Sequence, residues 1–249
     1  MIVVHIPCDG TTTSYAQYCF EAMQCTSTKG AELRLELHTC PRHPKLAADN
    51  HCAAVREAFR SIEAEPEAVH VICDSDTVTV LQDWDVIISN AFEQFDCIGT
   101  AYQRAGTQQT GFGRKQTYKG KPNVEWLALK PGRPWYLFDP ANTVRPEPLV
   151  VTTKEDEALW GLPWGTQLLT DACWNFPLFL REQGLTSYAL ENVEPKRYIA
   201  LVGFGSYEEW HLDGVPFVVH QGKSRKNPFR SPGFSAEFYD RCDQLIKQK

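Results

Sequence analysis

The stretch Val69-His70-Val71-Ile72-Cys73-Asp74-Ser75-Asp76-Thr77-Val78 joins an apolar run of strand length to two carboxylates that are one residue apart. In an open α/β sheet, ligands bind at the carboxyl ends of strands. We therefore expect Asp74 and Asp76 to lie at the rim of a sheet, with their oxygens facing a crevice. Paired carboxylates suit Mg²⁺ or Mn²⁺, ions that proteins commonly share with substrate phosphates. The stretch predicts metal-assisted chemistry on a phosphorylated substrate.

The residues before this stretch alternate between strand and helix patterns. Strands are expected over Ile2–Pro7, Leu33–His38 and Val69–Cys73, and helices over Tyr15–Met23 and Ala47–Ile62. The order strand, helix, strand, helix, strand is typical of a doubly wound α/β sheet. We therefore expect an α/β fold whose central sheet is mixed, mostly parallel and flanked by helices.

The residues after this stretch are expected to extend the same sheet. The chain has no internal repeat and no clear linker, which favours a single domain over residues 1–249. We divide that domain into residues 1–102, a less regular middle of residues 103–198, and C-terminal strands with a helix in residues 199–249. The further expected elements are a helix over Val86–Phe95, strands over Asp96–Tyr102 and Asn123–Leu129, a long helix over Trp164–Gln183, strands over Ile199–Phe204 and Val215–His220, and a helix from Ser235.

Composition narrows the class of protein. The 249 residues carry a net charge of −6, which argues against broad nucleic-acid binding. Gln221–Arg230 nevertheless contains four basic residues and no acidic one, so a local anion site is consistent with the sequence. The nine scattered cysteines indicate reduced thiols, and we find no signal peptide or transmembrane segment. We expect a cytoplasmic protein, or one of the host cytoplasm if the chain is viral.

Cysteine and histidine also gather before the expected second helix. Cys40, His43, His51 and Cys52 form a loose C-x2-H-x7-H-C pattern. Structural zinc sites use these residue types, but the spacing fits no common zinc finger. The sequence leaves open whether this group binds zinc or contains incidental thiols.

Three stretches of the chain resemble nucleotide-sugar-dependent glycosyltransferases of the GT-A fold. Ile2–Gly10 resembles their first strand and the turn around the nucleotide. Asp74-Ser75-Asp76, followed by Trp84-Asp85, resembles their Asp-x-Asp motif and the next helix. Val218–Arg225 resembles their C-terminal strand and loop, where a histidine can complete the metal shell. The likeness covers the first ~100 and the last ~30 residues in outline.

The resemblance implies a single GT-A-like, Rossmann-related domain. Such an enzyme moves a sugar from a nucleotide-sugar, with a UDP-sugar as our first expectation, to a hydroxyl of a glycan or a modified DNA base. Residues 1–102 then bind the donor, and residues 103–198 face the acceptor. The implied cofactor is Mn²⁺ or Mg²⁺, held by Asp76 and His220, with Asp74 on the metal or the ribose. The implied donor-binding residues are Pro7, Asp9, Thr11, Asp74, Ser75, Lys223, Ser224 and Arg225.

The sequence indicates the catalytic base less clearly than it indicates the metal ligands. An inverting transferase needs a carboxylate to accept the proton of the acceptor, whereas a retaining one can lack such a base. Asp171 lies in an expected helix rich in aromatic residues and is our first candidate, and Asp156 is the second. Aromatic residues are dense between Tyr118 and Trp174, which is typical either of a sugar- or base-binding pocket or of a core.

Two other functions are consistent with the same stretch. Asp74-Ser75-Asp76-Thr77-Val78 matches the Asp-x-Asp-x-Thr/Val pattern of haloacid-dehalogenase-type phosphatases, in which the first carboxylate attacks phosphorus. Those enzymes carry a later acidic pair, and the only downstream acidic run, Glu155-Asp156-Glu157, follows no apolar strand. A non-catalytic module that binds a nucleotide-sugar is the other alternative.

Overall fold

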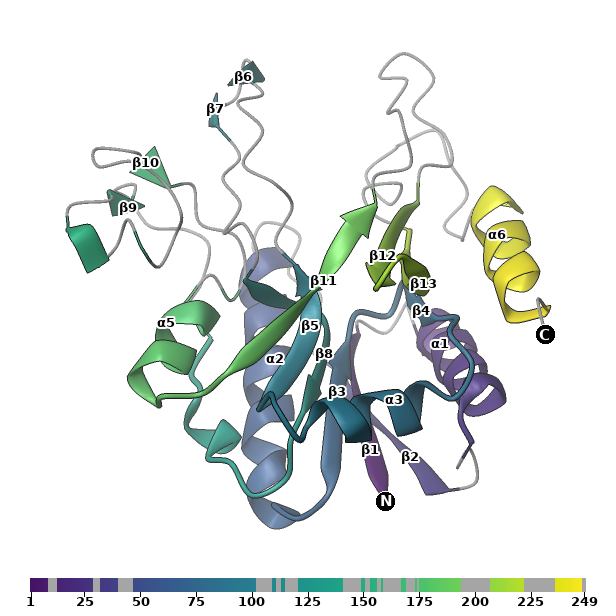
Figure 1. Cartoon of the computed structure of the whole chain (residues 1–249), viewed down its shortest axis with the longest axis horizontal. Helices are drawn as coiled ribbons and strands as arrows, with labels where there is room; N and C mark the ends of the chain where they lie inside the picture. The colour runs from purple at the N-terminus through teal and green to yellow at the C-terminus, as the bar shows by residue number, and fades with distance from the viewer. Residues whose placement is uncertain are drawn as a thin grey trace.

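The computed structural model places nine strands in one curled sheet (Figure 1). It describes residues 1–8, 13–28, 32–39, 47–101, 109–110, 113–114, 121–140, 149–150, 153–155, 158, 167–168, 173, 175–193, 207–221 and 236–247. From one edge to the other, the sheet consists of β2 (Leu33–Thr39), β1 (Ile2–Cys8), β3 (Val69–Cys73), β8 (Pro122–Leu129), β5 (Cys97–Ala101), β11 (Ser187–Val193), β12 (Glu208–Leu212), β13 (Val215–His220) and β4 (Thr77–Thr79).

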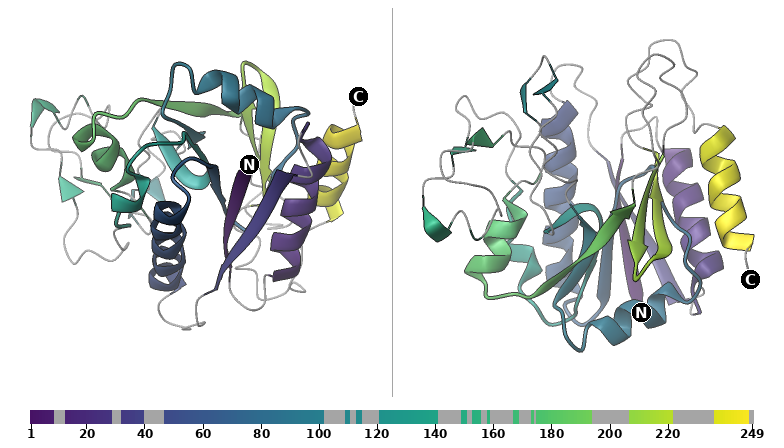
Figure 2. Two further views of the ribbon diagram at one scale, coloured as in Figure 1. Left: turned by 90° about the horizontal axis from the view of Figure 1, so that it is seen from below. Right: turned by 45° about the horizontal axis from the view of Figure 1, so that its top comes forward.

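The direction of the strands corrects our expectation of a mostly parallel, helix-flanked, GT-A-like sheet. Three neighbouring pairs are parallel, namely β1 with β2, β1 with β3, and β5 with β11. The other five pairs are antiparallel. The cause is that β8 enters between β3 and β5 against both, and that β12, β13 and β4 add an antiparallel edge. The sheet curls into half of a barrel with few helices around it (Figure 2).

Helices pack on this sheet at a few places only. On one side lie α1 (Thr13–Thr26), α3 (Trp84–Ala91) and α6 (Ala236–Lys247), and on the other lie α2 (Ala47–Ser61) and the short α5 (Phe176–Glu182). Two 3₁₀ turns, η2 (Ile62–Ala64) and η3 (Trp135–Leu137), follow α2 and β8. Among the described residues, no helix is both long enough and apolar enough to cross a membrane.

Most expected elements are confirmed within a few residues. The helix expected over Trp164–Gln183 is wrong, because Gln167–Leu168 forms the short strand β10, which pairs with β9 (Leu149–Val150), and α5 begins only at Phe176. The strands β4, β11 and β12 were not expected, and the strand expected over Ile199–Phe204 lies outside the described residues. A further short hairpin joins β6 (Gln109–Thr110) to β7 (Gly113–Arg114).

Alternation along the central strands divides the core into two clusters. Successive side chains of a strand point to opposite faces of a sheet. Val71 of β3 and Trp126 of β8 therefore pack on the α1 side, whereas Ile72 and Leu127 pack on the α2 side with Phe59. Both clusters are rich in aromatic residues and include residues of β3, and the cluster on the α1 side also includes residues of β13.

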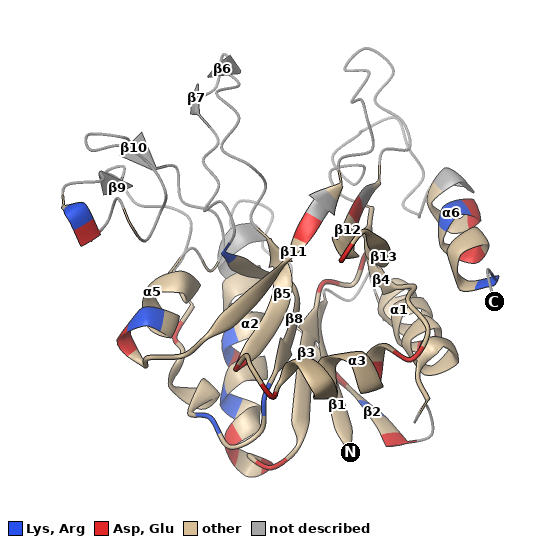
Figure 3. Cartoon of the chain, in the orientation of Figure 1, with Lys and Arg blue, Asp and Glu red and all other residues tan. Residues whose placement is uncertain are grey.

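An ion pair connects the C-terminal helix α6 to β12. α6 carries both acidic and basic residues (Figure 3), and Arg241 donates two hydrogen bonds to Glu209, at 2.5 and 3.0 Å. His211 lies 3.1 Å from the same carboxylate, of which only 8% is exposed. Burial raises the pKa of Glu209, but the hydrogen bonds from Arg241 and His211 outweigh burial and hold that pKa below its ordinary value.

This pair predicts a loss of stability in acid. Because the folded pKa of Glu209 is depressed, its ionised form stabilises the fold above pH 4.5, and that contribution disappears as the pH falls through the folded pKa. We expect Glu209→Gln to lower Tm at pH 7 and to match the wild type more closely at pH 3.5. Arg241→Gln should cost about 2 kcal/mol at pH 7, since it removes charge-assisted hydrogen bonds to the Glu209 carboxylate. Thermal unfolding at both pH values measures this, and an unchanged Tm difference between wild type and Glu209→Gln would contradict it.

Candidate metal centre

The chain turns sharply where β3 ends and β4 begins. The backbone N–H of Asp74 donates to the carbonyl of Glu125 at 2.8 Å, which fastens the end of β3 to β8. The N–H of Thr77 donates to the carbonyl of Asp74 at 3.1 Å, which closes the turn. The N–H of Gln221 then donates to the carbonyl of Asp76 at 3.0 Å. Both carboxylates thus lie in a turn whose backbone is fixed from two directions.

The third polar group comes from a strand far along the chain. β13 pairs with β4 in antiparallel register, with His220 opposite Thr77. Nε2 of His220 lies 3.5 Å from Oδ1 of Asp76, and each side chain is only about a tenth exposed. One ligand atom each from Asp74, Asp76 and His220 lie within 4.8 Å of one another. The expected metal ligands are therefore brought together from two segments of the sheet.

A fourth group approaches from α2. Nε2 of His51 lies 3.7 Å from Oδ1 of Asp74, and both side chains are partly exposed. Sequence reasoning placed His51 in a possible zinc group rather than here. Its only signal in the sequence was its position near the start of the helix expected over Ala47–Ile62, and spacing alone does not show which strand end that helix covers.

The described members of the Cys-His group have separate partners. While His51 faces Asp74, the thiol of Cys52 is buried, and its hydrogen bond with Cys173 lowers its pKa to about 7. Cys40 and His43 lie outside the described residues. The question of zinc in this group therefore stays open.

Two buried thiols, those of Cys19 and Cys73, lie near the carboxylates, and neither belongs to the group of ligand atoms that the described residues form. Sγ of Cys19 donates to the carbonyl of Ser75 at 3.3 Å. Burial raises the pKa of the Cys73 thiol, and the carboxylates of Asp74 and Asp76 raise it further. The donor atoms that the described residues bring within 4.8 Å of one another here are carboxylate oxygens and an imidazole nitrogen.

Of the other predicted site residues, only Pro7 and Ser75 lie in the part of the chain that the structure describes. Pro7 lies on β1 opposite His38, and Ser75 is buried in the turn between the two carboxylates. The role of Pro7 and Ser75 in binding the nucleotide-sugar stays a prediction. The remaining predicted residues lie outside the described part of the chain, namely Asp9, Thr11, Asp156, Asp171, Lys223, Ser224 and Arg225.

The donor set fits a hard or borderline divalent cation. Carboxylate oxygens suit Mg²⁺ and Mn²⁺, and the imidazole of His220 favours Mn²⁺ over Mg²⁺. Three protein ligands leave other coordination positions for water or for oxygens of a substrate phosphate. The arrangement can therefore bind a cation and present it to an anionic ligand.

Comparisons with known proteins add little to this geometry. No family model matches the chain, and no curated protein matches it. Among solved structures, the chain is similar to the A197 protein from STIV, with a TM-score of 0.39 and 13% identity. That alignment covers 76% of this chain and 81% of the A197 chain. A likeness at this level supports no conclusion about fold or activity.

Proposed function

We propose that this protein is a metal-dependent glycosyltransferase, which moves a sugar from a nucleotide-sugar to a hydroxyl acceptor. The observation that carries the proposal is the convergence of Asp74, Asp76 and His220, whose ligand atoms lie within 4.8 Å of one another. Mn²⁺ or Mg²⁺ is the proposed ion. The proposed donor is a UDP-sugar, and the proposed acceptor is a glycan or a modified DNA base.

The charge of the leaving group explains why such a site is useful. When the sugar leaves, a nucleoside diphosphate gains negative charge, and a divalent cation supplies preorganised positive charge for it. Asp76, in the turn before β4, and His220, at the end of β13, would hold the ion from two segments of the chain, so its position would not depend on the donor. Asp74, which is more exposed than Asp76, is suited to contact the metal or the ribose.

Two proposed roles depend on residues outside the described part of the chain. Directly after His220 and Gln221 the sequence continues into Lys223, Ser224 and Arg225. Cationic side chains at this position can donate charge-assisted hydrogen bonds to phosphate oxygens. Asp171, with Asp156 as the alternative, stays the predicted base for an inverting reaction.

A thermal-shift screen tests the proposal. UDP-, GDP-, CMP- and dTDP-sugars are each added with Mn²⁺ or with EDTA. A donor at about 100 times its dissociation constant adds about 2.7 kcal/mol, which raises Tm by roughly 5–10 °C for a chain of this size. We expect such a shift with one nucleotide class in Mn²⁺, and no shift in EDTA.

Product analysis then separates transfer from the alternatives. Release of nucleoside diphosphate when an oligosaccharide or DNA acceptor is added supports the transferase. A metal-dependent shift without any release indicates a binding module. Phosphate release from an aryl phosphate without nucleotide-sugar indicates a phosphatase that uses Asp74 as nucleophile. Absence of a shift with every donor would contradict nucleotide-sugar binding.

A further inference from the structure

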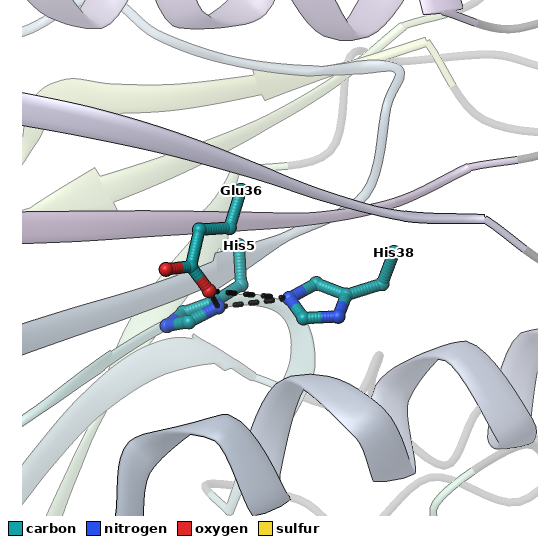
Figure 4. Close-up of side chains that lie close together, drawn as sticks. All are labelled: His5, Glu36 and His38. Carbon is teal, nitrogen blue, oxygen red and sulfur yellow. Dashed lines mark hydrogen bonds and ion pairs between the residues drawn. The ribbon is translucent and has the colours of Figure 1, made fainter. Parts of the chain in front are cut away.

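A second polar cluster lies within the sheet, away from the strand ends that carry the two aspartates. His5 of β1 and Glu36 of β2 are direct neighbours in parallel register, and His38 follows on the same face of β2. Figure 4 shows the three side chains pointing toward one another. His5 is 1% exposed, whereas the side chains of His38 and Glu36 are 12% and 30% exposed at the edge of the sheet. The cluster is thus closed at His5 and open at β2.

The hydrogen-bond partners assign the protons of the buried rings. Nε2 of His70 lies 2.9 Å from the carbonyl oxygen of Glu65, which only accepts, so this nitrogen carries the proton. Burial lowers the pKa of His70, and burial together with His70 and His38 lowers the pKa of His5 to about 2. Both rings are therefore neutral. The unprotonated Nδ1 of His70 accepts from Nε2 of His5 at 2.8 Å, which leaves Nδ1 of His5 as a lone pair.

Two oxygen atoms with lone pairs lie close to Nδ1 of His5. Oε2 of Glu36 lies 3.3 Å from Nδ1 of His5, while Oε1 of the same carboxylate accepts from Arg34 at 2.8 Å. Oγ of Ser61, at the end of α2, lies 3.4 Å from Nδ1 of His5. The hydroxyl of Ser61 donates to the carbonyl of Ala58 at 2.8 Å, so it too presents a lone pair. Two oxygen acceptors thus lie within 3.4 Å of the lone pair of His5, an arrangement that favours a cation.

His38 completes the group. Its Nε2 lies 2.9 Å from Nδ1 of His5 and 3.9 Å from Oε2 of Glu36. Burial lowers the pKa of His38, so this ring is also neutral at pH 7. In one neutral tautomer Nε2 donates to His5, and in the other tautomer it presents a lone pair to a metal. A change of tautomer therefore converts the hydrogen-bonded cluster into a set of ligands.

We propose that Nδ1 of His5, Oε2 of Glu36 and Nε2 of His38 bind a Zn²⁺ ion. Zinc bonds of about 2.0–2.2 Å in a tetrahedron place ligand atoms roughly 3.3–3.6 Å apart. The three separations here are 2.9, 3.3 and 3.9 Å, so shifts of about half an ångström suffice. The fourth position falls to water or to Ser61.

The surroundings of the cluster have the second layer of contacts that zinc sites use. Zinc-bound histidines commonly donate their other ring N–H to an acceptor, which fixes the tautomer. His5 donates to His70, which donates to a backbone carbonyl, and Arg34 orients Glu36. A bound ion would connect the edge strand β2 to β1. This site shares no residue with Asp74, Asp76 and His220, so the two sites can be emptied separately.

Equilibrium dialysis with Zn²⁺, followed by metal analysis, tests the site in an Asp76→Asn background. That background removes one of the two carboxylate ligands of the other centre. We expect one zinc per chain to remain, and Glu36→Gln or His38→Asn to weaken its binding by at least ~100-fold. Co²⁺ in place of Zn²⁺ should give the visible absorption of a tetrahedral site with two nitrogen ligands.

Control variants show whether weaker zinc binding comes from a missing ligand or from an unfolded protein. Glu36→Gln is isosteric and partly exposed, and its metal-free Tm should lie within a few degrees of the parent. His211→Asn changes a histidine that contacts Glu209 on β12 and should bind zinc as the parent does. The proposal is overturned if the Asp76→Asn protein binds no zinc, or if Glu36→Gln and His38→Asn bind it as tightly as their parent.

Discussion

Replacement of Asp76 with asparagine is expected to reduce turnover by at least ~100-fold and to abolish the Mn²⁺-dependent Tm shift with the donor. Asparagine keeps the shape of the side chain but removes the negative charge that faces His220 at 3.5 Å. The backbone carbonyl of Asp76, which accepts from Gln221, is unchanged by the substitution. The loss should therefore come from the metal and not from the fold.

The control for this variant lies in the same hairpin as His220. Asp213, between β12 and β13, has φ of 50°, a conformation that asparagine also adopts readily. Asp213→Asn should keep both the Tm shift and turnover. Initial rates at saturating Mn²⁺, with nucleoside diphosphate release as the readout, provide the measurement. Undiminished turnover of Asp76→Asn in saturating Mn²⁺ would remove Asp76 from the metal site.

The first three strands and two helices were predictable because their signals are local. The apolar run ending at Cys73 and the helical spacing over Ala47–Ile62 depend only on neighbouring residues. The direction of β8 is different, since an antiparallel insertion between β3 and β5 is decided by contacts far apart in sequence. A strand pattern contains no information on direction, so the mostly parallel sheet was a wrong extrapolation from the first three strands.

For the candidate metal centre, too, the residues with a local sequence signal were predictable, and the contacts between distant segments were not. Asp74 and Asp76 were predictable from the rule that ligands bind at strand ends. The approach of His220 depends on the pairing of β13 with β4, a strand that the sequence analysis missed. The cluster of His5, Glu36 and His38 was not predicted, because His5 lies on β1 while Glu36 and His38 lie on β2, and only the parallel register of the two strands brings them together.

The dense aromatic residues of the middle region have one clear role where the structure describes them. Trp126 of β8 is fully buried, and its Nε1–H donates to Oγ1 of Thr79 on β4 at 2.9 Å. Its ring packs edge-on against Phe217 of β13, with centroids 5.0 Å apart, and against Trp84. Trp126 therefore connects the centre of the sheet to both strands beside the candidate metal ligands.

We expect Trp126→Ala to destabilise the protein by about 3–5 kcal/mol, because it empties a large volume and removes the partner of the buried Thr79 hydroxyl. Tm should fall by roughly 10 °C. Since β4 and β13 lose their common support, Mn²⁺ affinity should also fall when it is measured well below Tm. Calorimetric unfolding and a Mn²⁺ titration provide the two readouts.

Trp135→Ala is the matched control, since Trp135 is equally buried but belongs to the cluster on the α2 side. Its Nε1–H donates to the carbonyl of Lys130, directly after β8, and not to a residue of β4. This variant should lose similar stability and keep its Mn²⁺ affinity. If both variants lost affinity equally, the site would depend on global stability. A lower Mn²⁺ affinity of Trp126→Ala alone would mean that the indole of Trp126 keeps Asp76 and His220 in position relative to each other.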